Sequence, residues 1–218
     1  MKAADLILHY HPLSSFCQKA LIALYEHGVA FTPKLVDLRN PEERAALCAL
    51  WPIGKFPVLE DHGRDAVVAE SSIVIEYIDR HYRGAAPLLP SDPEQALRAR
   101  HFDRVFDLYV HLPMQKIVGD RLRPEGSKDP HGVAEARRTL DTSYGLIDRE
   151  LTQRQWVLGD SYSLADCSAS PALGYADMAH PIGAEFSHTR RYLQRLRQRP
   201  SYARALKEAE PYLHMVPR

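Results

Sequence analysis

The sequence has few cysteines and no long apolar segment. Its 218 residues include only three cysteines, Cys17, Cys48 and Cys167, which is too few for a disulfide scaffold of this length and favours a reducing compartment. No stretch approaches the roughly 18–20 apolar residues of a membrane-spanning helix. The opening residues, MKAADLILHY, have too short an apolar run for a signal peptide. We therefore expect a cytoplasmic protein with no membrane partner.

An excess of charge of either sign is also missing. Lys+Arg and Asp+Glu both number 28, so the formal net charge is zero, and no bulk electrostatic attraction to nucleic acid is expected. The locally basic segment 190–207 is typical of an amphipathic helix with a solvated face. His9 and His11 have no third ligand near them in the sequence, so we expect no metal site. The remaining composition, 45% hydrophobic and 26% charged, is that of a globular chain.

The first third of the chain alternates between strand and helix patterns. Apolar runs bounded by turn residues predict strands, and apolar residues at helical spacing predict helices. Pro33 indicates an edge strand, and Ser71 is expected to cap the last helix. The predicted elements are strand 5–10, helix 14–28, strand 31–38, helix 40–50, a hairpin of strands 56–61 and 66–70, and helix 71–82. This βαβαββα order predicts an α/β layer with a mixed sheet.

The rest of the chain has almost no strand signal. Residues 83–92 are rich in proline and small residues and are the expected linker between a first domain, 1–82, and a second, 93–218. Pro113 is expected to kink or break the first helical segment beyond the linker. Four segments have helical spacing: 93–122, 133–152, 163–178 and 187–199. The second domain is therefore expected to be entirely helical.

A serine-rich loop runs directly into the first predicted helix. The spacing Ser14-x-x-Cys17 is that of a thiol redox motif whose first sulfur has been replaced by oxygen. A helix N-terminus favours an anion, and a hydroxyl placed there can donate a hydrogen bond to a thiolate that a ligand brings. Ser14, Ser15 and Tyr10 are all candidate donors, although either serine could simply cap the helix. Cys17 falls on the apolar face, which favours core packing.

Two further segments suit a peptide-like ligand. In GKFPVLED (54–61), Pro57 holds Phe56 extended, and a cis bond between them would leave the Phe56 backbone free to pair with a peptide. Glu70 and Ser71 open a helix, where the serine and backbone N–H groups can bind a carboxylate while Glu70 accepts from an ammonium group. An ordinary strand-opening proline and a capping serine are the simpler interpretations.

Together with the capping-box pattern Ser163-x-x-Asp166, these features resemble the cytosolic glutathione S-transferases, specifically bacterial serine-type members of unassigned class. The resemblance extends over nearly the whole chain. It implies a thioredoxin-like N-terminal domain with a four-stranded mixed sheet, followed by an all-α helical bundle. It also implies glutathione as co-substrate, no metal, and a homodimer.

The resemblance also assigns residues. Ser14 corresponds to the thiolate donor of serine-type members, and Tyr10 falls where tyrosine-type members place their catalytic phenol. The implied glutathione-binding residues are Ser14, Lys55, Phe56, Pro57, Glu70 and Ser71. Gly54 stands where the family often has Lys or His, so the contact to the glycine carboxylate is left open, with Lys55 as the substitute. The electrophile is expected against Tyr109, His111, Met114 and Gln115.

The expected function is a transferase that holds glutathione as its thiolate and promotes attack on a small hydrophobic electrophile, as in detoxification. One alternative is a non-catalytic glutathione-binding or regulatory protein of the same fold, similar to stringent starvation protein. Another is a glutathione-dependent isomerase or a thiol oxidoreductase that uses Cys17. The sequence leaves the electrophile and the type of reaction open.

Overall fold

The computed structural model describes residues 5–82, 84 and 86–216. The first part contains β1 (Leu6–Tyr10), α1 (Ser15–Glu26), β2 (Thr32–Leu35), α2 (Pro41–Leu50), β3 (Val58–Asp61), β4 (Ala66–Ala69) and α3 (Ser71–His81). The sheet has the order β2-β1-β3-β4, with β2 parallel to β1 and the remaining pairs antiparallel. This is the thioredoxin-like arrangement that was predicted, with Pro33 on an edge strand.

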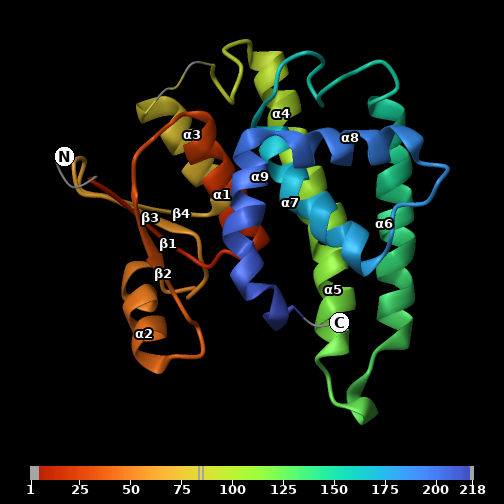
Figure 1. Cartoon of the computed structure of the whole chain (residues 1–218), viewed down its shortest axis with the longest axis horizontal. Helices are drawn as coiled ribbons and strands as arrows, with labels where there is room; N and C mark the ends of the chain where they lie inside the picture. The colour runs from red at the N-terminus through yellow and green to blue at the C-terminus, as the bar shows by residue number, and fades with distance from the viewer. Residues whose placement is uncertain (1–4, 83, 85, 217–218) are drawn as a thin grey trace.

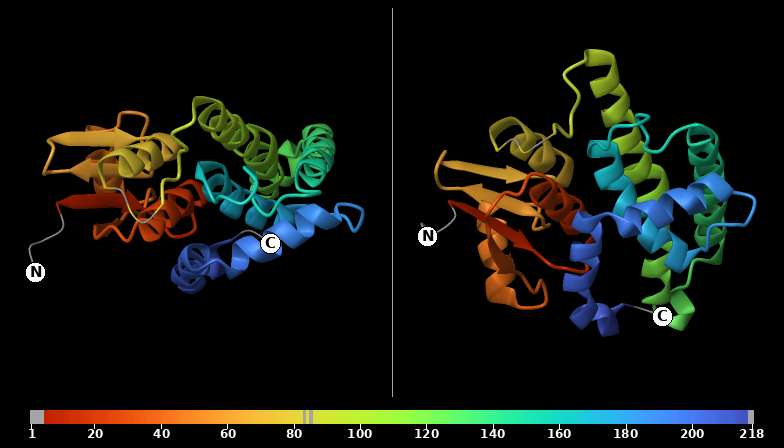
Figure 2. Two further views of the ribbon diagram at one scale, coloured as in Figure 1. Left: turned by 90° about the horizontal axis from the view of Figure 1, so that it is seen from above. Right: turned by 45° about the horizontal axis from the view of Figure 1, so that its top comes forward.

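Helices cover both faces of this sheet (Figures 1 and 2). Because side chains alternate along a strand, Leu6 and Leu8 of β1 pack with Leu59 of β3 against α1 and α3. On the other face, Val58 packs with Val36 and with Leu47 of α2. Asn40 caps α2 by accepting from the backbone N–H groups of Glu42 and Glu43. The loops that join these layers carry the candidate site.

The second part is helical, as predicted. It contains α4 (Pro93–Val105), a π-helical segment η1 (Phe106–His111), α5 (Leu112–Arg121), a 3-10 turn η2 (Glu125–Ser127), α6 (Pro130–Glu150), α7 (Leu164–Ala179), α8 (Ser187–Gln198), α9 (Pro200–Ala209) and a final 3-10 segment η3 (Glu210–Met215). The Ser163–Asp166 capping box opens α7. Within the described residues no helix is long and apolar enough to cross a membrane. The proposed boundaries 1–82, 83–92 and 93–218 stay a prediction.

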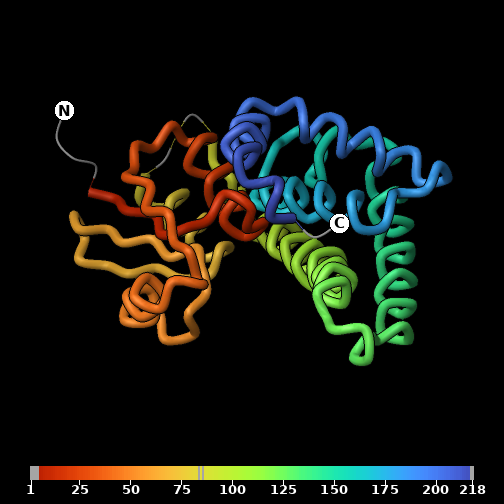
Figure 3. The backbone as a smooth tube through the Cα atoms, turned by 60° about the horizontal axis from the view of Figure 1, so that its bottom comes forward, coloured from red at the N-terminus to blue at the C-terminus, as the bar shows by residue number. Residues whose placement is uncertain are grey.

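The two parts share a core, and α1 lies at their junction. Ile22 and Ala23 of α1 and Ile75 of α3 belong to the same buried cluster as the helical core. Helix α1 packs against α7 and α9 on the side away from the sheet, and Figure 3 shows α9 running beside it. The N-terminus of α1 is therefore held by both parts of the molecule.

Of the kink or break expected at Pro113, the structure shows no break in the helix. The chain stays helical from Pro93 to Arg121, with the wider π turn immediately before α5. A proline has no N–H to donate to the carbonyl four residues earlier, which is that of Tyr109. The hydroxyl of Ser143 on α6 lies 2.8 Å from this carbonyl and also 2.8 Å from the Thr139 carbonyl of its own helix, so its one proton is shared between the two acceptors. A side chain from the neighbouring helix thus replaces the missing backbone donor.

Candidate functional site

A pocket of about 400 Å³ opens where the loops of the sheet meet the helical part. It brings together all six predicted glutathione-binding residues, which come from three separate loops. Its lining is Ser14, Phe16, Leu38, Trp51, Ile53, Lys55, Phe56, Pro57, Glu70, Ser71, Leu112 and Gln115.

Ser14 is the N-cap of α1 and stands in this pocket. Its backbone N–H donates to the His11 carbonyl at 2.9 Å, and its Oγ accepts from the Cys17 backbone N–H at 3.3 Å. Oγ acts as an acceptor toward the helix, and among the hydrogen bonds of the described residues none has this hydroxyl as the donor. The first-turn N–H groups of Ser15 and Phe16 have no partner within the helix. The terminus therefore offers several donors to an anion.

The other candidate donors lie elsewhere. Ser15 is buried, and its Oγ lies 3.1 Å from Nε2 of buried His111. Burial, reinforced by the charge of Lys19, lowers the pKa of His111 to about 4, so this histidine is neutral at pH 7. Tyr10 lines a different pocket, beside β2 and α9. Of the three, only Ser14 lines the pocket of the predicted binding residues.

Cys17 lies on the apolar face of α1 and is completely buried. Burial raises the pKa of its thiol to about 12, so the side chain is un-ionised at neutral pH. Since the thiolate is the nucleophilic form, this placement fits a core residue and does not favour redox chemistry.

Helix α3 begins without the predicted serine cap. Glu70 occupies the N-cap position with φ of 69°, a left-handed conformation that is uncommon for residues other than glycine. No side chain caps the helix, so its first-turn N–H groups remain available beside Ser71. Glu70 itself is exposed at the pocket. N–H groups that can bind an anion and a carboxylate that can bind a cation thus lie side by side. This pair suits an α-amino-acid group, which carries one charge of each sign.

The Phe56–Pro57 peptide bond is cis. Among the hydrogen bonds of the described residues, none uses the backbone N–H or C=O of Phe56. Gly54 has φ of +66°, and a Cβ there would lie 2.9 Å from the Cys48 sulfur. A residue with a side chain would therefore be strained at position 54. Lys55, exposed at the pocket, is the cation among the lining residues.

The four residues predicted for the electrophile are split by the structure. Gln115 lines the pocket together with Leu112. Tyr109 lines a separate hollow against α6, His111 is buried against Ser15, and Met114 belongs to the helical core. The sequence did not indicate the apolar wall of the pocket, which is formed by Phe16, Leu38, Trp51, Ile53 and Leu112. Exposed large apolar side chains such as Ile53 would have been the signal, but exposure is invisible in the sequence.

A buried polar cluster around Lys19 holds the start of α3 against the helical part. Lys19 of α1 bonds to Ser72, which follows Ser71, at 2.8 Å. Lys19 also lies 2.5 Å from Asp103 and 3.0 Å from Asp107, and Arg104 donates to Ser72 at 2.7 Å. Burial raises the pKa of Asp107. For Asp103 burial acts in the same direction, but Lys19 and the hydrogen bonds outweigh it and lower its pKa. The cluster ties both halves of the pocket to the helical part.

No group of three or more His, Cys, Asp or Glu side chains in the part of the chain that the structure describes is arranged to hold a metal ion. The lining of the pocket supplies hydrogen-bond donors, one carboxylate and one ammonium group around an apolar wall.

Comparison with known proteins agrees with this geometry. Residues 8–86 match the family model "Glutathione S-transferase, N-terminal domain", and residues 130–199 match the corresponding C-terminal domain. Glutathione S-transferase U10 of Arabidopsis thaliana is 30% identical to this chain, in a match that covers 84% of this chain and 77% of the length of that protein. The FtsZ-localized protein A of Caulobacter vibrioides is 29% identical over 94% and 92%. A stringent starvation protein A homolog of Histophilus somni is 26% identical over 96% and 94%.

Solved structures resemble the chain over almost its full length. A glutathione S-transferase of Methylobacterium radiotolerans in complex with glutathione sulfonate has a TM-score of 0.80 at 27% identity, covering 92% of this chain and 93% of that one. One from Methylobacillus flagellatus with glutathione bound has a TM-score of 0.83 at 24% identity, covering 92% and 98%, and supports the fold.

Proposed function

Because the chain belongs to the glutathione S-transferase family, we propose that it is a glutathione-dependent transferase. It binds glutathione, keeps its sulfur as the thiolate, and directs that sulfur at the electrophilic atom of a small apolar molecule. The observation that carries the proposal is the placement of Ser14, whose side chain lines the same pocket as Phe56, Glu70 and Ser71.

Ser14 acts in this proposal as the donor to the thiolate. Lowering a thiol pKa from about 8.5 to the range of 6–7 requires roughly 2–3 kcal/mol. A hydrogen bond to a charged group contributes about 1.5–3 kcal/mol, and the N-terminus of α1 adds to it. One hydroxyl and one helix terminus are therefore sufficient. The thiolate then forms a bond to the electrophile, and the displaced electron pair leaves with the leaving group or resides on the adduct.

The remaining binding residues match the three parts of the tripeptide. The γ-glutamyl end carries an ammonium and a carboxylate, which suit Glu70 and the open terminus of α3 at Ser71. The cysteinyl backbone pairs with the free backbone groups of Phe56. The glycine carboxylate pairs with Lys55, since Gly54 offers no side chain. The electrophile rests against Phe16, Ile53, Leu112 and Gln115, which line the same pocket.

A non-catalytic glutathione-binding or regulatory role is the second candidate. It is favoured by relatives of comparable identity whose names are not those of transferases, namely FtsZ-localized protein A and the stringent starvation protein A homolog. In that case glutathione would bind without transfer. An isomerase would use the same Ser14 site, whereas a thiol oxidoreductase would need Cys17, which is buried.

We also propose that the protein is a homodimer in a reducing, cytoplasmic compartment, with a role in detoxification. Support for the dimer comes from large apolar side chains that stay exposed on adjoining elements: Val67 on β4, Ile73 on α3 and Leu97 on α4. Arg100 and Glu76 form a double hydrogen bond that joins α3 and α4, so these elements present one surface.

Calorimetric titration with glutathione tests the binding site. We expect Glu70→Gln to weaken glutathione binding by about tenfold, because it removes the acceptor for the ammonium group. Glu94→Gln, an exposed carboxylate on α4, is the matched control and should bind as the wild type. Absence of glutathione binding, or equal affinity in both variants, would refute the assignment.

Product analysis by mass spectrometry tests transfer itself. Incubation with glutathione and a panel of aryl halides, epoxides and enones should yield a glutathione adduct for at least one class. Tight glutathione binding with no adduct from any of them would favour the regulatory role.

A further inference from the structure

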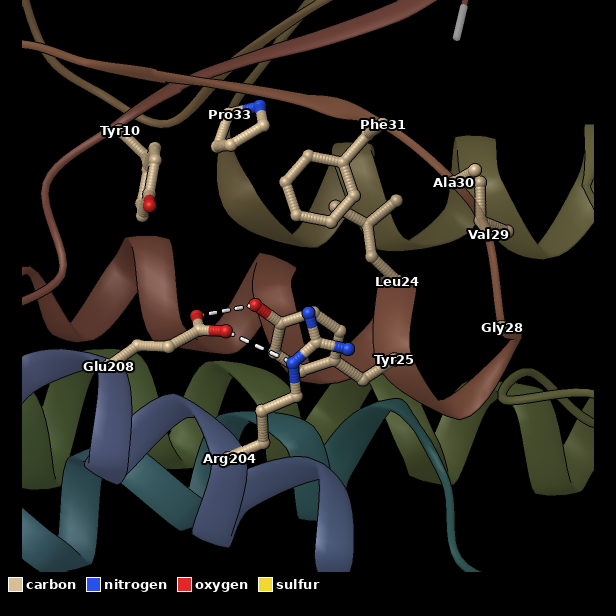
Figure 4. A pocket seen from close by; sticks show the side chains of 10 residues that line it. All are labelled: Tyr10, Leu24, Tyr25, Gly28, Val29, Ala30, Phe31, Pro33, Arg204 and Glu208. Carbon is tan, nitrogen blue, oxygen red and sulfur yellow. Dashed lines mark hydrogen bonds and ion pairs between the residues drawn. The ribbon is translucent and has the colours of Figure 1, made fainter. Parts of the chain in front are cut away.

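The turn that precedes Ser14 lies beyond the end of the sheet and is held by other contacts. Strand β1 ends at Tyr10, whose carbonyl accepts from the Val36 backbone N–H at 3.0 Å. The Tyr10 side chain lies outside the glutathione pocket, and Figure 4 shows it in the separate pocket between β2 and α9. Residues 11–14 then form a turn, in which the Ser14 N–H donates to the His11 carbonyl at 2.9 Å. The position of the Ser14 hydroxyl therefore depends on what fixes this turn.

Side chains bind every polar backbone group of the two residues inside the turn. Gln18 of α1 donates from Nε2 to the Pro12 carbonyl at 2.8 Å, and the hydroxyl of Tyr175 on α7 donates to the Leu13 carbonyl at 2.8 Å. The Leu13 N–H donates to Nδ1 of His11 at 3.2 Å, and Pro12 has no N–H. Rearranging the turn would therefore break hydrogen bonds to three separate side chains.

Gln18 and Tyr175 anchor the turn to the helical part of the molecule. Gln18 is completely buried, and its Nε2 also donates to the Tyr175 hydroxyl oxygen at 3.3 Å. Because this hydroxyl accepts from Gln18 and donates to Leu13, two partners fix its orientation. Burial raises the pKa of Tyr175 to about 12, so it keeps its proton at neutral pH. A helix of the second part thus supplies a donor to the residue directly before Ser14.

His11 connects the turn with another loop of the site and with the C-terminal segment. Its ring stacks on that of Phe56, with the centroids 6.4 Å apart, and packs edge-on against Tyr212 of η3, 5.1 Å away. Its Nδ1 can accept the backbone N–H of the turn only while it carries no proton. Burial is the largest influence on the pKa of His11 and lowers it, against the opposing charge of Asp37. The ring is therefore suited to act as a neutral acceptor at pH 7.

We propose that Tyr175, Gln18 and His11 are positioning residues for the thiolate donor. They hold the turn so that the Ser14 hydroxyl points at the glutathione sulfur, although none of the three lines the glutathione pocket. This inference rests on the proposed function, in which Ser14 donates to that sulfur. A hydrogen bond weakens steeply as its angle falls, so a displaced turn would leave glutathione bound but its thiol less acidic.

Tyr175→Phe tests the anchor from α7. With the protein saturated with glutathione, the ultraviolet absorbance of the thiolate against pH gives the pKa of the bound thiol. We expect about 7–8 in Tyr175→Phe, between about 6–7 in the wild type and the roughly 8.5 of a free thiol. At about pH 5.5, where the bound thiol is protonated in both proteins, calorimetry should give the wild-type affinity for glutathione.

Tyr144→Phe is the matched control. Tyr144 is a buried tyrosine of the helical part, and its hydroxyl also donates to a backbone carbonyl, that of His180, at 3.0 Å. Both variants lose one hydrogen bond of the same kind, so urea unfolding should show similar losses of stability. Only Tyr175→Phe should change the pKa of the bound thiol.

Two substitutions of His11 separate its acceptor from its ring. Leucine removes the acceptor, so His11→Leu should raise the pKa of the bound thiol as Tyr175→Phe does. Asparagine offers a side-chain oxygen to the N–H two residues ahead, as in an Asx turn. His11→Asn should therefore lie closer to the wild type than His11→Leu.

The results separate failure of this inference from failure of the proposed function. A wild type whose bound thiol keeps a pKa of about 8.5 would refute the thiolate-donor function itself. A low pKa that Ser14→Ala raises, but that Tyr175→Phe and His11→Leu leave unchanged, would overturn only the positioning role. An equal rise in Tyr144→Phe, or no difference between His11→Asn and His11→Leu, would also overturn it, because neither result depends on the bonds to the turn.

Discussion

A single hydroxyl has two tasks in this molecule. Ser14 starts α1 by accepting from the Cys17 N–H, and the proton that this contact leaves unused is the one proposed to meet the glutathione sulfur. Alanine would lose both tasks. Glycine would preserve some capping but no donor. The local rule that selects serine as an N-cap thus also places a donor at the positive end of the helix.

The protonation state of buried His111 can be tested by the pH dependence of stability. Its pKa is lowered from about 6.5 to about 4 by burial and by Lys19. Between these values the unfolded chain binds more protons, so the free energy of unfolding rises with pH. The contribution of His111 to the free energy of unfolding is complete above about pH 6.5 and is lost as the pH falls to about 4. It amounts to about 3 kcal/mol.

His111→Gln removes this titration while keeping an amide near Ser15. On going from pH 7 to pH 4.5, we expect the free energy of unfolding of the wild type to fall by about 2–3 kcal/mol more than that of the variant. Urea unfolding at several pH values measures it. A difference that does not change with pH would contradict the buried, neutral state of this histidine.

Residue-level prediction from the sequence succeeded where local pattern decides position. The three loops that carry Ser14, Phe56 and Glu70 each have a short signature at the end of a strand or the start of a helix, and the structure brings them into one pocket. Residues 109–115 were harder, because the face that a helix turns inward depends on tertiary packing. The π turn at 106–111 adds a residue to the turn and rotates the following face by about 100°.

The long helical segment from α4 to α5 depends on a contact with a neighbouring helix. Proline at 113 predicted a kink or a break. The helix continues without a break, and Ser143 on α6 provides a donor for the Tyr109 carbonyl. That compensation comes from a residue thirty-four positions away and could not be foreseen locally. The strands, α2 and the α7 capping box rest on local signals and were foreseen. Helix α9 begins at a proline within the basic tail, so the sequence suggested one amphipathic segment where the structure has two helices.

Ser143→Ala tests this compensation. The substitution removes the donor from a carbonyl next to a buried turn, and we expect it to lower the free energy of unfolding by about 1–3 kcal/mol. Thr142→Ala is the matched control on the same helix, because its hydroxyl is exposed and bonds only to the Arg138 carbonyl of its own helix. Chemical denaturation of both variants measures the effect. An equally small decrease in the free energy of unfolding of both variants would mean that the hydrogen bond from Ser143 to the Tyr109 carbonyl does not stabilise the helix.

At the scale of the whole molecule, the two parts are joined by charge as well as by apolar packing. Lys19, 1% exposed, faces Asp103 and Asp107 across the junction. Removing one partner from a buried ionic group leaves the others uncompensated, which commonly costs about 3–5 kcal/mol. The junction therefore holds Ser72, and through it the start of α3, in place.

Lys19→Met should accordingly lower the free energy of unfolding by about 3–5 kcal/mol. Lys34→Met, at an exposed position on β2, should change it by less than about 0.5 kcal/mol. Thermal and urea unfolding give the two values. If both variants were equally stable, the junction would not depend on this cluster.

The proposed dimer is a second property of the whole molecule. Leu97, 62% exposed on α4, is a central apolar side chain of the proposed contact surface. We expect wild type to sediment as two chains and Leu97→Glu to sediment as one at low micromolar concentration, because a buried carboxylate without a partner opposes association. Leu122→Glu, at a 69% exposed leucine that directly follows α5, should leave the dimer intact. A monomeric wild type would contradict the dimer directly.

The ionisation of bound glutathione tests the central claim most directly. The ultraviolet absorbance of the thiolate, followed against pH with the protein saturated, gives the pKa of the bound thiol. The account predicts a value of about 6–7 in the wild type and a return toward about 8.5 in Ser14→Ala, while Ser15→Ala and Tyr10→Phe stay near the wild type. A low pKa that persists in Ser14→Ala, or that is lost in Tyr10→Phe instead, would contradict it.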